Sequence, residues 1–212
     1  MNTKHRFLLT AILLLGAISL KAQEAAYDHK IIAILPFKTT SFKTLPKGND
    51  SVIQRLMASE AALSLEVQEA FYNAITADQD RLLVDVQNWQ LTDSLLKAAN
   101  LDFRKIIYAD KQVLANLLKV DAVLAGEFNS HQLAGASAAP DVAAITAAGG
   151  AWALVNMMNR PTKLTVFLYD GKTGDPLWNF EKELVANPVF NNSKKLEGRL
   201  YKAFIKKFPY TR

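Results

Sequence analysis

The 212-residue sequence contains no cysteine. This absence excludes disulfide bonds, thiolate metal sites and a cysteine nucleophile, and it also excludes a lipid anchor on an N-terminal cysteine. Histidine is scarce as well, with three in the whole chain. His29 precedes a predicted strand and His131 follows another, so neither belongs to a helical metal-binding pair. We therefore expect structural or solvent-exposed roles for both, and no metal or other cofactor.

The sequence also lacks the motifs of common enzymes. It has no G-x-S-x-G turn that would present a nucleophilic serine. Gly171-Lys172-Thr173 resembles the end of a phosphate-binding loop, but Val166 stands where that motif needs its first glycine. A strand is predicted to follow, whereas a phosphate site needs a helix whose amides point at the phosphate. We therefore expect a hairpin turn at this position and a protein that is not an enzyme.

The N-terminus reads as an export signal. Lys4, His5 and Arg6 precede an apolar run of 14 residues from Phe7 to Leu20. That run is short for a membrane-spanning helix, which needs about 20 residues, so it favours a cleaved signal peptide over an uncleaved anchor. We predict a signal over residues 1–22, with cleavage after Ala22 or Gln23. The remaining chain of about 190 residues suits a single exported domain.

Without the predicted signal, the chain is less basic than the whole sequence. Lys4, Arg6 and Lys21 leave with the signal and no acid leaves with them, so the formal charge falls from +5 to +2. A nearly neutral protein gives no indication of nucleic-acid binding. The remaining basic character is local: between Lys194 and Arg212 there are seven Lys and Arg residues against one acid, Glu197.

Hydrophobic periodicity predicts an α/β domain over residues 30–208. Short β-branched or apolar runs predict three strands, at Ile31–Phe37, Leu82–Val86 and Ala122–Phe128. Spacings of three, four and seven predict one long helix from about Asn49 to Ala77, either continuous or broken near Ser59, and further helices over Leu91–Ala99 and 111–120. In the last of these, Val113, Leu114, Leu117 and Leu118 share one face, and Asp110 is its expected cap. The alternation of strands and helices predicts parallel pairing.

A different pattern closes the chain. Lys163–Tyr169 and Leu177–Leu184 alternate around turn residues, which predicts an antiparallel hairpin whose second arm is a charged edge strand. A terminal helix is expected from Ser193 to Phe208. The fold class is therefore one mixed sheet of about five strands, β-α-β-α-β followed by a hairpin, with helices packed on it.

The terminal helix is predicted to be amphipathic. Its apolar residues recur every four positions, and its cations are displaced around the helix at Lys195, Arg199, Lys202 and Lys206. These cations form either a solvated face or a surface for an anionic lipid headgroup or an acidic partner. Both interpretations stay open from the sequence.

An Ala/Gly-rich insertion at 133–160 separates the third and fourth strands. Val142 to Asn159 has no charge over 18 residues, but six are alanine and two are glycine. Membrane insertion depends mainly on Leu, Ile, Phe and Val, and the segment does not alternate as a membrane hairpin would. We expect a loop and short helix that covers the sheet or meets a second copy of the chain. The candidate partner-binding residues are Trp152, Leu154, Val155, Met157 and Met158.

Four blocks, in order, resemble bacterial envelope proteins of the CsgG and LpoB type. They are KIIAILPF, RLLVDVQNWQLTDSLLKA, LLKVDAVLAGEF and LTVFLYDGKTGDPLW, between Lys30 and Trp178. The resemblance implies a fold similar to the N-terminal domain of TolB and a non-enzymatic role in the periplasm. One branch of these proteins forms oligomeric outer-membrane export channels, and another binds and activates peptidoglycan synthases. The family offers no catalytic residues to transfer, and its typical lipid anchor has no counterpart here.

Three functional hypotheses follow. The first is an exported accessory protein of the cell envelope that binds partner proteins, as a monomer or a homo-oligomer, with peripheral contact to the outer membrane left open. The second is a subunit of an outer-membrane-associated export channel that uses 142–159 as a membrane-contacting insert. The third is an enzyme whose site is not recognisable in the sequence. We favour the first hypothesis, since neither a membrane span nor a catalytic motif is evident.

Overall fold

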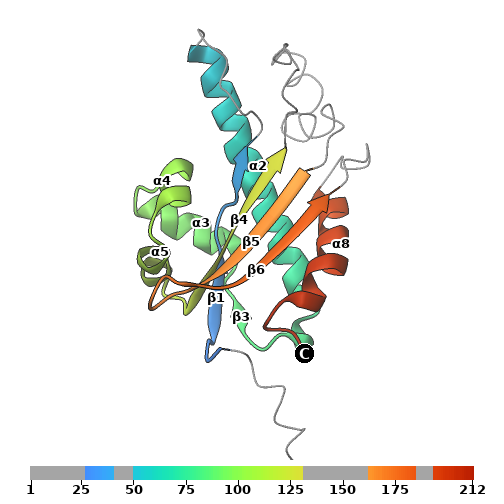
Figure 1. The fold of residues 1–212 in the computed structure, drawn as a ribbon. Helices are drawn as coiled ribbons and strands as arrows, with labels where there is room; N and C mark the ends of the chain where they lie inside the picture. The colour runs from blue at the N-terminus through green and yellow to red at the C-terminus, as the bar shows by residue number, and fades with distance from the viewer. Residues whose placement is uncertain (1–26, 41–49, 131–161, 185–192) are drawn as a thin grey trace, which may run out of the picture.

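Figure 1 shows the computed structural model, which describes residues 27–40, 50–130, 162–184 and 193–212. Six strands form one sheet in the order β3-β1-β4-β5-β6, and β2 also pairs with β4. The strands are β1 (Ile31–Ile34), β2 (Lys38–Thr40), β3 (Asp85–Val86), β4 (Ala122–Ser130), β5 (Thr162–Asp170) and β6 (Pro176–Leu184). β1 pairs in parallel with β3 and β4, whereas β4, β5 and β6 are antiparallel. The predicted mixed α/β sheet is confirmed.

Helices cover the two faces of this sheet unequally (Figure 1). One face carries α2 (Asp50–Thr76) and α8 (Ser193–Phe204), with 3₁₀ turns at Gln79–Arg81 and Ile205–Lys207. The other face carries α3 (Trp89–Ala98), α4 (Phe103–Tyr108) and α5 (Lys111–Leu118). Each of the helices α3, α4 and α5 begins with a capping side chain that accepts hydrogen bonds from backbone N–H groups of the first turn. The caps are Asn88, Asp102 and Asp110. These caps fix where each short helix begins.

Strand β4 lies at the centre of both cores. Ala122 and Leu124 pack in the larger core with α2 and α8, while Val123 packs in the smaller core with α3 and α5. All three side chains are fully buried. Burial on both faces explains the unbroken apolar run at the start of the strand, since a parallel sheet covered on both sides needs no polar alternation.

The first predicted strand is interrupted, which corrects the prediction of one strand over Ile31–Phe37. β1 ends at Ile34 and pairing with β4 resumes in β2, opposite Glu127. Pro36 lies in the gap, and proline has no N–H to donate to a sheet. The ring of Phe37 then turns against Gly126 of β4, where an added Cβ would lie 2.1 Å from Phe37 Cε1. Glycine at 126 is therefore required by this close approach.

The second predicted strand is shorter than expected. Only Asp85–Val86 pairs with β1. The preceding residues pair with the C-terminus instead: the Leu83 N–H donates to the Tyr210 carbonyl at 2.8 Å, and Leu82 forms an antiparallel bridge with Thr211. A contact with residues so distant in sequence cannot be read from local periodicity.

The helices predicted within the described residues are confirmed, with two corrections and one addition. Of the two forms left open for the first helix, α2 has the continuous one, over 27 residues. On α5, Leu114 and Leu118 are buried as predicted, but Val113 is 60% exposed. The terminal helix ends at Phe204 and passes into a 3₁₀ turn, four residues before the predicted end. α4 was not predicted, because a six-residue helix is too short to show clear periodicity.

Replacement of Gly126 by alanine is expected to destabilise the protein. The new methyl group would meet the Phe37 ring and the Thr165 carbonyl, and overpacking of a core costs about 1–3 kcal/mol. Urea unfolding followed by circular dichroism measures the change. Gly198→Ala in α8 is the matched control, because nothing lies within 4 Å of an added Cβ there. Its helical position predicts a gain of up to about 1 kcal/mol, and a loss at Gly126 no larger than at Gly198 would contradict the packing argument.

Candidate binding surface on the sheet

Among the residues that the structure describes, β6 and much of β5 are left open on one face of the sheet. The core that includes α3, α4 and α5 contains Ala33 and Val123 from β1 and β4, but no residue of β6. In Figure 1 these three helices gather on the β1–β4 side, and none of the described helices lies over β6 on that face. Of β5, Tyr169 packs against their core. The outward residues of β6 on this face, Asn179, Glu181 and Glu183, are accordingly exposed in the described structure. This open face is the candidate binding surface.

Two aromatic side chains occupy the middle of the open face. Phe167 and Tyr169 are half-buried neighbours on β5, with ring centroids 6.0 Å apart. Around them lie charged pairs: Lys163 Nζ is 2.7 Å from Glu181 Oε1, and Lys38 Nζ is 3.0 Å from Glu127 Oε1. An aromatic centre within a polar rim is the usual composition of a protein-binding surface.

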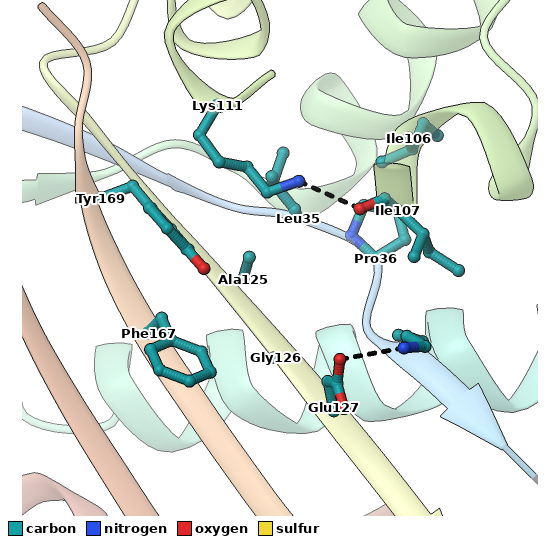
Figure 2. Close-up of a pocket in the computed structure, with 11 residues that line it drawn as sticks. Leu35, Pro36, Ile106, Ile107, Lys111, Ala125, Gly126, Glu127, Phe167 and Tyr169 are labelled. Carbon is teal, nitrogen blue, oxygen red and sulfur yellow. Dashed lines mark hydrogen bonds and ion pairs between the residues drawn. The ribbon is translucent and has the colours of Figure 1, made fainter. Parts of the chain in front are cut away.

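A pocket of about 80 Å³ lies beside these aromatic residues (Figure 2). The pocket forms where strand pairing is interrupted between β1 and β2. Leu35 and Pro36 lie in this interruption and form one wall of the pocket. Ile106 and Ile107 of α4 form another wall. Small residues of β4 also line the pocket: Ala125, and Gly126, which has no side chain. The break in the first strand thus creates the cavity.

The ammonium group of Lys111 is held in this pocket. Its Nζ donates to the carbonyl of Ile107 at 3.1 Å and to that of Ala109 at 2.8 Å, the first of which Figure 2 draws. These carbonyls lie at the end of α4, where a cation is favoured. Burial lowers the pKa of Lys111, although the negative charge of Asp110 opposes the effect.

Tyr169 projects into the same pocket from β5 (Figure 2). Burial raises the pKa of its hydroxyl, and the charge of Glu127 raises it further, so the hydroxyl keeps its proton at neutral pH. No residue in the described part of the chain accepts a hydrogen bond from it. The pocket therefore combines apolar walls with two groups able to donate hydrogen bonds.

A second polar cluster joins distant segments at the other end of the sheet. His29 Nδ1 contacts the Tyr210 hydroxyl, and His29 Nε2 lies 3.2 Å from Asp170 Oδ2. Burial raises the pKa of Tyr210, and nearby acidic groups add to this, so the hydroxyl is protonated and donates to Nδ1. Asp170 also accepts the N–H groups of Lys172 and Thr173 in the predicted turn. Burial alone raises the pKa of Asp170, but these donors outweigh it and lower the pKa overall.

This tyrosine, histidine and aspartate arrangement resembles a catalytic triad in composition only. Tyr210 is fully buried, so its oxygen cannot reach a substrate, whereas a nucleophile must be accessible. The expected structural role of His29 agrees with this geometry. The cluster connects the start of β1, the β5–β6 turn and the C-terminus, which are the segments that sequence periodicity could not bring together.

The residues proposed from the sequence lie elsewhere. Trp152, Leu154, Val155, Met157 and Met158 fall outside the described residues, as does His131, so their roles stay predictions. Lys202 on α8 and Lys206 in the 3₁₀ turn after it are exposed. Arg199 is half-buried, and Lys195 lies in the first turn of α8. Leu200 and Phe204 are buried on the opposite side, which confirms that the helix is amphipathic.

The open face was missed by the sequence reasoning, although the sequence holds a signal for it. In Lys163–Tyr169 every second residue is apolar and buried, as predicted. The intervening positions should be polar if they face water, yet two of them are Phe167 and Tyr169. Tyr169 packs against the core of α3, α4 and α5, whereas Phe167, an aromatic residue on the nominally polar side of an antiparallel strand, indicates a surface that binds a partner.

Comparison with known proteins gives structural neighbours only. No family model matches the chain, and no curated protein matches it. Solved structures similar to it include the LpoB C-terminal domain from Salmonella enterica, at 11% identity and a TM-score of 0.40 over 79% of this chain and 91% of that one. Another is lipoprotein GNA1162 from Neisseria meningitidis, at 15% identity and a TM-score of 0.41 over 84% and 96%.

A third similar structure is a PelC dodecamer from Paraburkholderia phytofirmans, at 10% identity and a TM-score of 0.41 over 89% of this chain and 94% of that chain. The LpoB part of the resemblance inferred from the sequence blocks therefore has a counterpart among the structural neighbours. The CsgG part stays a prediction.

Loss of the Tyr210 hydroxyl is expected to destabilise the fold. Tyr210→Phe leaves the buried Nδ1 of His29 without its partner, and an unsatisfied buried polar atom costs about 1–3 kcal/mol. Urea unfolding measures the difference from the unmodified protein. Tyr108→Phe is the matched control: its side chain is 78% exposed, so the change should stay within about 0.5 kcal/mol. Equal stability of the two variants would contradict a structural role for the cluster.

Proposed function

We propose that this chain is an exported, non-enzymatic component of the bacterial cell envelope that acts by binding a partner protein. The observation that carries the proposal is the open face of β5 and β6, with half-buried Phe167 and Tyr169 at its centre and a pocket beside them. The predicted signal over residues 1–22 supports the exported location.

The chemistry of the open face favours binding over catalysis. Two ion pairs lie on its rim, Lys163 with Glu181 and Lys38 with Glu127, and a carboxylate held by a lysine is less available for acid–base work. In the part of the chain that the structure describes, no group of His, Asp and Glu residues is arranged to hold a metal. Aromatic side chains such as Phe167 and Tyr169 bury a large area at low entropic cost, so they suit the centre of an interface.

The channel hypothesis depends on residues that the structure does not describe. Residues 142–159 lie outside the described ranges, so their contact with a membrane stays a prediction. Among the described helices, none has the length and apolar content needed to cross a bilayer. Assembly into a homo-oligomer likewise stays a prediction.

A charged substitution on the open face is expected to abolish partner binding. Phe167→Glu places an acid in the aromatic centre, and the amount of partner retained from native envelope extracts on the tagged protein should fall at least about tenfold, the loss of one hot spot of about 2 kcal/mol or more. Quantitative mass spectrometry of the captured proteins measures this. The melting temperature of the variant verifies that it is folded.

The control for that experiment introduces the same charge away from the open face. Leu91 on α3 is a large apolar residue that is 50% exposed, so Leu91→Glu replaces an apolar surface residue with the same charge. It should retain every protein that the unmodified chain captures. If both variants lose the same proteins, or neither loses any, the open face is not the binding surface.

The amphipathic helix α8 supports a second contact, with an anionic membrane surface. Phe204 packs against Phe71, Trp178 and Phe180 at centroid distances of 5.3, 5.5 and 5.3 Å, which anchors the helix on the fold. Lys202, Lys206 and Lys207 are then left exposed at its C-terminal end. A cluster of cations on a rigid support attracts anionic lipid headgroups.

Charge reversal of Lys202→Glu with Lys206→Glu is expected to weaken binding to vesicles of anionic phospholipid by at least about tenfold, since each lysine near such a surface contributes about 1 kcal/mol. Co-sedimentation at low salt measures binding. Arg104→Glu with Lys172→Glu makes the same charge change at exposed positions outside α8 and should have a smaller effect. Equal losses would show that net charge, rather than α8, determines binding.

A further inference from the structure

The pocket beside the open face has unused capacity to donate hydrogen bonds. The ammonium of Lys111 has three N–H groups, and two of them bond the carbonyls of Ile107 and Ala109. The hydroxyl of Tyr169 donates to no acceptor within the described ranges. Because both groups line one small pocket and face it from different walls (Figure 2), an acceptor placed there could bond both.

The charge of the pocket favours a negative acceptor over a neutral one. Its lining contains two cations, Lys38 and Lys111, and one carboxylate, Glu127. Glu127 is compensated, because its Oε1 lies 3.0 Å from Lys38 Nζ. Among the lining residues one positive charge, that of Lys111, is therefore left over, and the negative charge of Asp110, which also acts on Lys111, lies outside the lining. Lys111 is half-buried and burial lowers its pKa, so a nearby anion would stabilise its charged form.

The rest of the pocket suits a short apolar stem. Leu35, Pro36, Ile106 and Ile107 are aliphatic, and the volume of about 80 Å³ exceeds the roughly 10–15 Å³ that one ordered water needs. An acidic side chain combines one or two methylene groups with a single carboxylate. Its size and charge match a pocket whose walls are apolar and whose lining carries two donors and a net positive charge.

We propose that this pocket binds a glutamate or aspartate side chain of a partner protein that docks on the open face of β5 and β6. The inference rests on the proposed function and names the chemistry of the partner. The pocket lies next to Phe167 and Tyr169, which form part of its lining, so an acid presented on a protein surface would enter it while its apolar neighbours cover those rings. A free carboxylate would make the contacts within the pocket but not the apolar contacts with the rings of Phe167 and Tyr169, so we expect it to bind less tightly.

The test uses two peptides that differ only in charge. The probe is acetyl-Ala-Leu-Glu-Leu-Ala-amide, and its control is the same peptide with glutamine. Each is titrated into the ¹⁵N-labelled protein purified after export, and binding is followed by the amide signals of Ala125, Gly126 and Phe167, which line the pocket. We expect the glutamate peptide to shift these signals in a saturable way and to bind at least tenfold more tightly than the glutamine peptide.

Substitutions in the pocket identify the two donors. Lys111→Met should lower the affinity for the glutamate peptide at least tenfold and remove the preference over the glutamine peptide. Arg104→Met removes the same charge from an exposed residue of α4 and should change neither the affinity nor the preference. Lys111 also contacts the end of α4, so Tyr169→Phe provides a second test that removes only a hydroxyl. This variant should lower the affinity for the glutamate peptide several-fold and leave the affinity for the glutamine peptide unchanged.

Four results would overturn the inference. The first is that the two peptides bind equally well, and the second is that Lys111→Met and Tyr169→Phe bind the glutamate peptide as tightly as the unmodified protein does. The third is that sodium acetate binds as tightly as the glutamate peptide. The fourth is that the same amide signals shift when the protein concentration is raised without peptide. The third result indicates a free anion, and the fourth a second copy of the chain.

The failure of this inference can be distinguished from the failure of the proposed function. If Phe167→Glu abolishes capture of the envelope partner but Lys111→Met does not, the partner uses the open face without the pocket, and only the inference fails. If the glutamate peptide binds but Phe167→Glu leaves capture unchanged, the proposed function fails and the acid preference of the pocket stands alone.

Discussion

The fold depends on one constraint at the centre of the sheet. Strand β4 pairs with β1 and β2 along one edge and with β5 along the other, so every layer is positioned through it. The first strand cannot follow β4 continuously, because Pro36 interrupts its hydrogen bonds. Phe37 fills the core at the interruption, and only a glycine at 126 leaves room for its ring. Pro36 therefore interrupts the strand, and the contact of Phe37 with Gly126 keeps the core filled at the interruption.

That constraint also creates the candidate site. Where β1 gives way to β2, Leu35 and Pro36 line a pocket instead of continuing a regular strand. The short helices α4 and α5 close two sides of it, and Lys111 joins them by binding the carbonyls at the end of α4. The same three-helix layer does not reach β6. A sheet covered by long helices on one face and short helices on the other thus leaves an open area next to a cavity.

Sequence reasoning succeeded where local pattern determines structure. Apolar runs located β1 and β4, alternation located β5 and β6, and Asp110 located the start of α5. It failed where a distant partner decides the outcome. Leu82–Val84 have the composition of a strand, but two of these residues pair with the C-terminal segment instead of β1. Val113 fits the periodicity of α5, but the neighbouring elements leave that position exposed.

By itself the sequence determined the α/β fold class, the absence of thiol chemistry and the amphipathic character of the last helix, because composition and periodicity act through local geometry and solvation. The export signal at the N-terminus stays a prediction from the sequence. Only the tertiary structure decided which half of the sheet stays open and where the pocket lies. It also decided that His29, Asp170 and Tyr210 meet. These features depend on contacts between residues up to 181 positions apart, whose distance is fixed by packing and leaves no periodic trace along the chain.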